Sequence, residues 1–135
     1  MEIKEYTHYN EQEVLPLYAA VGWSAYTRDP AALKEGFAHS LLTLAAYDNG
    51  ELLGLIRTVG DGSTIVFIQD LLVYPEHQRQ GIGKALLEEV LARFANVRQI
   101  ELVTDDRPQT VAFYQSLEFT ELSQLGCRGF MRVKK

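Results

Sequence analysis

A short glycine-containing turn, Gln78 to Lys84, is the segment whose residue types are best suited to bind an anion. An apolar run ends at Val73, Pro75 follows, and the turn then leads into a long helical pattern. The first turn of a helix has unpaired N–H groups and a positive dipole end, and glycine lets a ligand come close to the backbone. The turn therefore predicts a site that surrounds a phosphate or pyrophosphate group with main-chain N–H groups.

Spacing excludes two common phosphate-binding motifs. A Walker loop has four residues between its glycines and Ser or Thr after its lysine, whereas one residue separates Gly81 from Gly83 and Ala85 follows Lys84. The Rossmann fingerprint needs a third small residue, and this chain has Leu86 there. Neither nucleotide-binding fold fits the sequence.

Hydrophobic periodicity and turn residues predict the elements that position this turn. Three apolar, β-rich runs are separated by Asp48-Asn49-Gly50 and by Gly60-Asp61-Gly62-Ser63, which indicates an antiparallel meander. The order β-α-α-β-β-β-α-β-α-β predicts an α/β (α+β) fold in which helices flank a mixed, mostly antiparallel central sheet. The expected strands are 2–6, 42–47, 51–59, 64–73, 100–103 and 130–133, and the expected helices are 10–22, 29–41, 82–94 and 108–117.

Composition narrows the class of protein. The 135 residues predict a single domain spanning residues 1–135, and the net charge of −5 opposes binding to nucleic acid. The charged N-terminus and the absence of a long apolar run predict a cytoplasmic protein without membrane contact. The single cysteine, Cys127, has no Cys or His at ligand spacing, so we expect neither a disulfide nor a bound metal.

The strand, turn and helix resemble the central motif of the GCN5-related N-acetyltransferase (GNAT) family. That family's pattern Gln/Arg-x-x-Gly-x-Gly/Ala is met by Gln78, Gly81 and Gly83 after a strand that ends in Val73-Tyr74-Pro75. The downstream segment "TVAFYQSLEF" is similar to the family's Phe-Tyr helix, and the order of elements agrees over essentially the whole chain. The resemblance implies transfer of an acetyl group from acetyl-CoA to an amine.

The resemblance also implies which residues hold the cofactor. The main chain of the strand end would pair with the pantetheine arm, and the turn would hold the pyrophosphate. The side chains of Arg79 and Lys84 either add positive charge near the adenosine phosphates or are solvated. The strand residues are Leu71, Leu72 and Val73, and the turn residues are Gln78, Arg79, Gln80, Gly81, Ile82, Gly83 and Lys84.

Two residues are candidates for proton transfer. Tyr114 matches the family's tyrosine, which is positioned to protonate the departing thiolate; otherwise it is a packed aromatic residue of an amphipathic helix. Asp70 interrupts the apolar run beside Gln69, and the strand period places these two polar side chains on opposite faces, at a bulge or an open edge. Asp70 either accepts the amine proton through a water or caps a neighbouring backbone group.

Three positions depart from the family pattern. Leu102 stands where some relatives have a glutamate base, and Arg107 stands where the family often has Asn. Glu118 replaces a glycine that stops the helix in a left-handed conformation, so we expect that turn to be built differently. The base is therefore unassigned, and one cofactor contact is in question.

The segment "VGWSAYTRDP" is expected to form the acceptor pocket, with Trp23 and Tyr26 as its apolar wall or as core residues. The predicted protein is thus an acetyl-CoA-dependent N-acetyltransferase for a primary amine of a small molecule or peptide, with a homodimer as one option. The alternatives are a non-catalytic acyl-CoA-binding or regulatory module and an interaction domain whose glycine turn is only structural.

Overall fold

The computed structural model describes residues 1–134, and Lys135, the last residue of the expected domain, lies outside them. The chain divides into two compact units, Met1–Leu102 and Val103–Lys135. The first unit holds a five-stranded sheet whose strands lie in sequence order. Its strands are β1 (Glu2–Glu5), β2 (Leu42–Asp48), β3 (Glu51–Gly60), β4 (Ile65–Val73) and β5 (Gln99–Leu102). The first four strands are antiparallel and β5 is parallel to β4, which confirms the predicted fold class.

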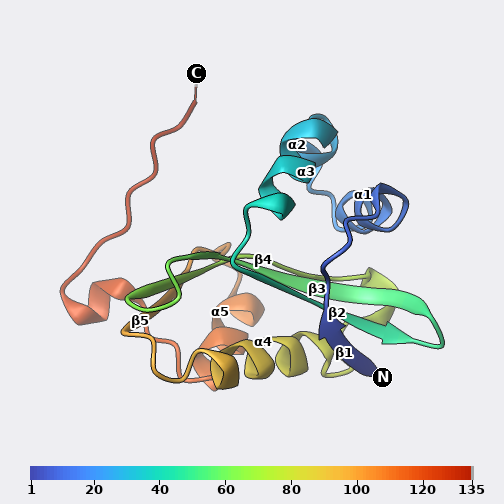
Figure 1. The fold of residues 1–135 in the computed structure, drawn as a ribbon. Helices are drawn as coiled ribbons and strands as arrows, with labels where there is room; N and C mark the ends of the chain where they lie inside the picture. The colour runs from blue at the N-terminus through green and yellow to red at the C-terminus, as the bar shows by residue number, and fades with distance from the viewer. Residues whose placement is uncertain (135) are drawn as a thin grey trace. The chain divides into compact units, whose positions relative to one another are not determined.

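Helices cover both faces of this sheet (Figure 1). Asn10 and Asp29 accept hydrogen bonds from the N–H groups of Gln12 and Ala32, and they therefore cap the N-termini of two of these helices. A one-turn helix between the two expected early helices was not predicted from the sequence. On one face lie α1 (Glu11–Ala20), α2 (Ser24–Thr27) and α3 (Pro30–Ala38), and on the other lies α4 (Ile82–Arg93).

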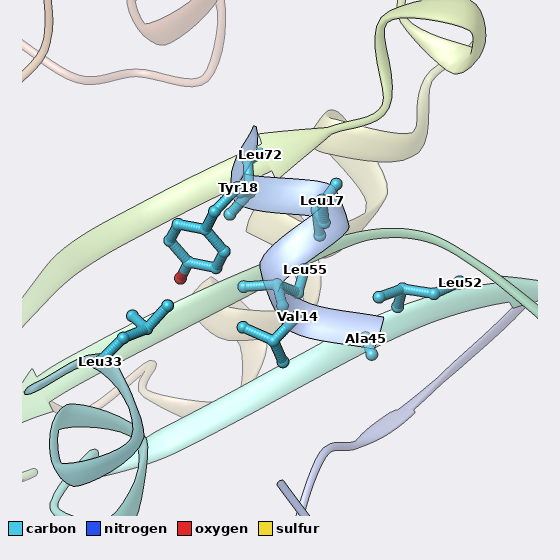
Figure 2. Close-up of a cluster of buried hydrophobic side chains, with 8 residues drawn as sticks. All are labelled: Val14, Leu17, Tyr18, Leu33, Ala45, Leu52, Leu55 and Leu72. Carbon is cyan, nitrogen blue, oxygen red and sulfur yellow. The ribbon is translucent and has the colours of Figure 1, made fainter. Parts of the chain in front are cut away.

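The core between the early helices and the sheet is apolar. Figure 2 shows Val14, Leu17 and Tyr18 of α1 beside the strand residues Leu55 and Leu72. The three α1 residues are spaced three and one apart, as one face of a helix requires, and all are fully buried. This packing holds α1 and its neighbours over the middle of the sheet. The cluster comprises Val14, Leu17, Tyr18, Leu33, Ala45, Leu52, Leu55 and Leu72.

The second unit contains α5 (Pro108–Ser116) and a 3₁₀ turn at Leu122–Leu125. Glu118 has φ 67°, and the N–H groups of Glu118 and Phe119 donate to the carbonyls of Gln115 and Tyr114. These two bonds form a Schellman motif, so the expectation that Glu118 changes the helix stop was wrong. The strand expected at 130–133 is not formed. A strand needs a neighbouring strand for its hydrogen bonds, and the described residues of this unit contain none.

Candidate active site

The end of β4 has an open edge. β5 pairs with β4 only from Ile65 to Ile68, where Ile68 stands opposite Leu102. Residues 70–73 therefore pair with β3 on one side, and on the other side no strand of the described chain adjoins residues 69–73. The carbonyl of Val73 accepts a hydrogen bond from Gln78, and the other outward N–H and C=O groups of this edge have no strand partner and can pair with an extended ligand. The predicted pantetheine-binding residues Leu71, Leu72 and Val73 all lie on this edge.

The glycine turn leads from this edge to the N-terminus of α4. Gly81 is the N-cap residue of α4 and has φ 83°, a left-handed conformation that glycine adopts without strain. No side chain caps the helix, and a Cβ built on Gly81 meets no atom within 4 Å. The start of α4 thus has no side-chain cap, and the space beside Gly81 is open. An uncapped helix N-terminus of this kind is a place where an anion can bind.

The side chains of the turn have separate positions. Gln78 donates from Nε2 to the carbonyl of Val73 at 3.0 Å, which ties the turn back to the end of β4. Arg79, with φ 63°, and Lys84 are both exposed. Their charges therefore lie at the surface, close in sequence to the N-terminus of α4.

Asp70 is the centre of a buried polar network on the face of the sheet that carries the early helices. Asp70 is only 2% exposed, and Arg57 is only 5% exposed. Oδ2 accepts hydrogen bonds from Nε of Arg57 at 2.7 Å and from the Tyr18 hydroxyl at 2.7 Å. Oδ1 accepts from the Tyr26 hydroxyl at 2.8 Å. Among residues 1–134 the carboxylate thus accepts hydrogen bonds from three side chains and from no backbone group of the kind that the capping alternative required.

A β-bulge brings Gln69 to the same side as Asp70. Arg57 stands opposite Asp70 and Thr58 opposite Ile68, so Gln69 is the extra residue on β4. Nε2 of Gln69 donates to the Tyr26 hydroxyl at 3.1 Å, and that hydroxyl donates to Asp70. The predicted bulge is confirmed, and the predicted placement of Gln69 and Asp70 on opposite faces was wrong because a bulge interrupts the strand alternation.

The network changes the acidity of its members. Burial raises the pKa of Tyr18 and of Tyr26, and the negative charge of Asp70 raises both further. Burial acts to lower the pKa of Arg57, but the charge and hydrogen bond of Asp70 outweigh it, and the pKa of Arg57 is raised. At neutral pH the network therefore holds a guanidinium cation and two neutral phenols around Asp70.

The two residues predicted for the acceptor wall lie beside this network. The rings of Trp23 and Tyr26 are 6.2 Å apart at 35°, and Tyr18 packs edge to face on both. Trp23 and Tyr26 are each half-buried, so each has one side in the core and another at the surface. The structure thus joins Tyr26 and Asp70, which the sequence suggested separately, and adds Tyr18 and Arg57, which it did not suggest.

Tyr114 belongs to the second unit, near the C-terminal end of α5. Its ring packs edge to face on Phe113 and Phe119, with centroids 5.0 and 5.8 Å away. Burial, and to a lesser extent the charge of Asp105, raises the pKa of Tyr114 to about 12. Asp105 also binds Nη2 of Arg107 at 3.1 Å. Tyr114 is therefore a neutral phenol over the physiological pH range.

The part of the chain that the structure describes offers neither a metal site nor a helix that could span a membrane. Within residues 1–134, no group of His, Cys, Asp and Glu side chains is arranged to hold a metal ion. Over the same residues, every helix is too short or too polar to span a bilayer.

An open strand edge followed by an uncapped helix N-terminus defines a protein able to bind an extended, anionic ligand. Residues 5–133 match the model of the acetyltransferase (GNAT) domain family, and the chain belongs to that family. Acetyl transfer from acetyl-CoA is the general reaction of its members.

Solved and curated relatives agree with this assignment. A GNAT-family acetyltransferase of Streptococcus pneumoniae TIGR4 is 40% identical, with a TM-score of 0.90 over 99% of this chain and 98% of that one. The fold also matches an aminoglycoside 6'-N-acetyltransferase complexed with coenzyme A, at 24% identity and a TM-score of 0.66 over 78% of this chain and 63% of that one. An uncharacterized N-acetyltransferase of Gracilaria tenuistipitata is 29% identical over 84% of this chain. This chain matches 63% of that relative's length, which is less than two thirds.

Proposed function

We propose that this protein transfers the acetyl group of acetyl-CoA to a primary amine of a small molecule or peptide by direct attack. The observation that carries the proposal is the open edge of β4 followed by the uncapped N-terminus of α4, in a chain of the GNAT family. Both compact units belong to one acetyltransferase domain, since the family match runs from residue 5 to residue 133.

The cofactor side of the site is formed mainly by the main chain. The outward groups of Leu71 to Val73 pair with the amides of the pantetheine arm, as an added strand would. The pyrophosphate lies beside Gly81, at the N–H groups of the turn and of the first turn of α4. A matching fold has been solved with coenzyme A, in the aminoglycoside 6'-N-acetyltransferase.

Tyr114 assists the departure of coenzyme A. The amine nitrogen forms a bond to the acetyl carbon, the C–S bond breaks, and the sulfur leaves with its electron pair. Because the pKa of Tyr114 is about 12 and that of a thiol is about 8.5, complete proton transfer to the thiolate is about 5 kcal/mol uphill. Tyr114 therefore acts by donating a hydrogen bond to the sulfur as negative charge develops there, and the amine proton leaves separately.

Asp70 acts on the acceptor side as a positioning residue. Its carboxylate already accepts hydrogen bonds from three side chains and is 2% exposed, so it holds Tyr26 in place rather than taking a proton from the amine. Tyr26 and Trp23 present the aromatic surface against which the acceptor binds. The residue or water that takes the amine proton is not one of the network members.

A non-catalytic acyl-CoA-binding module is the second candidate, because Asp70, the one carboxylate considered as a base, is buried and already accepts three hydrogen bonds. The experiment that separates the two measures thiol release from acetyl-CoA with a panel of amines, for the wild type and Tyr114→Phe. An enzyme gives amine-dependent thiol release, and Tyr114→Phe lowers kcat by about 10²-fold with little change in the Kd of acetyl-CoA. The binding module binds acetyl-CoA with equal affinity in both proteins and releases no thiol with any amine.

A further inference from the structure

Gln69, the extra residue of the bulge in β4, presents an unused hydrogen-bond acceptor at the surface. Its side chain is exposed and lies beside the half-buried Tyr26. Nε2 of Gln69 donates to the Tyr26 hydroxyl at 3.1 Å, and this is the one side-chain hydrogen bond of Gln69 within residues 1–134. The side-chain carbonyl oxygen Oε1 is therefore available to a ligand.

The buried network determines which end of the Gln69 amide faces Tyr26. The pKa of Tyr26 is raised, so its hydroxyl is neutral at neutral pH, and its one proton is donated to Oδ1 of Asp70 at 2.8 Å. The phenol oxygen can then only accept, so Gln69 must present its N–H donor there. Asp70 in turn is held by Nε of Arg57 at 2.7 Å. This chain of hydrogen bonds, which begins at a buried ion pair, turns Oε1 of Gln69 away from Tyr26.

Gln69 also lies where the proposed site brings the acetyl group, so the inference drawn from it rests on the proposed function. The pyrophosphate is placed at the turn after Val73, and the thioester is at the other end of the pantetheine arm. An arm that pairs with Leu71 to Val73 therefore runs back along β4 toward the residues before Leu71. Those residues are Asp70 and Gln69, and β5 has already ended its pairing at Ile68. An amine that attacks the thioester thus comes close to Gln69.

We propose that Oε1 of Gln69 accepts a hydrogen bond from the acceptor amine and thereby makes the enzyme selective for primary over secondary amines. The neutral amine forms the N–C bond with its lone pair, the C–S bond breaks to release the thiolate of coenzyme A, and one N–H proton passes to water. A primary amine keeps its second N–H in the amide product, so that N–H stays bonded to Gln69 throughout. A secondary amine has only the proton that must leave, so its bond to Gln69 is lost during the reaction.

The residues around Gln69 support this role in binding. The rings of Trp23 and Tyr26 lie 6.2 Å apart and are half-buried, so they offer apolar surface to the carbon chain of an amine. The two charged members of the network, Arg57 and Asp70, are paired with each other and at most 5% exposed. Their charges are therefore engaged within the core, and Oε1 of Gln69 is the acceptor that the network presents to a ligand.

The experiment compares the wild type with Gln69→Met and Gln69→Glu. Met keeps the length of the side chain and removes both polar atoms, whereas Glu keeps an acceptor oxygen and removes only the N–H that binds Tyr26. Because Gln69 is exposed, all three proteins should have similar urea midpoints and similar Kd values for acetyl-CoA. Thiol release is measured with the primary amine of the panel that reacts best and with its N-methyl derivative, and kcat/KM is determined for each amine.

The proposal predicts that Gln69→Met lowers kcat/KM for the primary amine about tenfold, mainly through KM, and reduces the preference over the N-methyl amine by a similar factor. Gln69→Glu should keep that preference. A Gln69 that only holds Tyr26 in place would give two variants that behave alike, because both lose the N–H donor, and that result would overturn the proposal. An unchanged kcat/KM in Gln69→Met would overturn it equally. A wild type that binds acetyl-CoA but releases thiol with no amine would instead refute the proposed transfer itself, and this inference with it.

Discussion

Replacing Asp70 by Asn should destabilise the fold far more than a typical substitution. Asn keeps the shape of the side chain but removes the negative charge, which leaves the Arg57 guanidinium buried without a counter-ion. Both residues are at most 5% exposed, so the solvent screening that weakens surface ion pairs does not reduce this effect. Removing one partner of a buried pair costs about 3–5 kcal/mol. Nη1 of Arg57 keeps Ser40 as an acceptor at 3.2 Å, and we therefore expect about 3 kcal/mol.

A double-mutant cycle separates the ion pair from the rest of the network. Arg57→Met alone leaves the charge of Asp70 buried and should cost about as much as Asp70→Asn. The double variant carries no buried charge, so its loss should be close to that of either single variant. Urea unfolding at neutral pH, followed by the fluorescence of the single tryptophan, Trp23, measures all four proteins. A loss below about 1 kcal/mol for Asp70→Asn, with additive effects in the double variant, would refute the reasoning.

Three further outcomes follow from other parts of the structure. Glu118→Gly should raise the free energy of unfolding by about 1 kcal/mol, because Glu118 holds a left-handed φ of 67° that costs an L-residue about that much; equal urea midpoints for the two proteins would contradict this. Tyr26→Phe should raise the KM for the amine with a smaller change in kcat, as steady-state kinetics will show, and a loss confined to kcat would argue against its positioning role. Burial and the charge of Glu13 raise the pKa of Tyr47 from 10.0 to about 12. The stability that this shift contributes is therefore fully present below pH 10 and is lost as the pH rises through 12, because the unfolded chain releases that proton first. Tyr47→Phe should make urea midpoints measured across this range less dependent on pH, and an unchanged dependence would count against it.

The sequence predicted the meander but not the ion pair inside it. Gly60 stands opposite Val66. Counting three residues back along β3 and three residues forward along β4 from this pair would place Gln69 opposite Arg57. The bulge adds one residue to β4 and brings Asp70 there instead. Asp70 itself indicated a bulge, but its position relative to the pairing could not be predicted from the strand alone.

Contacts between distant segments were beyond the sequence pattern. Tyr26 and Asp70 are 44 residues apart, and their hydrogen bond depends on how α2 lies over the sheet. The segment 130–133 has the period of a strand, but a strand forms only where a neighbouring strand offers hydrogen bonds, and composition does not name that neighbour. Glu118 adopts a conformation typical of glycine because two backbone bonds and the packing of Phe119 on Tyr114 hold it there.

The central claim, that the turn before α4 holds the pyrophosphate of acetyl-CoA, is tested by calorimetric titration of the wild type, Gly81→Asn and Gly81→Asp. Asn and Asp tolerate the left-handed conformation similarly, have nearly the same shape and enter the same open space, so only the charge at the anion site differs. We predict micromolar binding by the wild type, retained binding by the Asn variant, and a loss of at least about tenfold, or about 1.4 kcal/mol, in the Asp variant. No binding by the wild type, or equal affinities for the Asn and Asp variants, would contradict the claim.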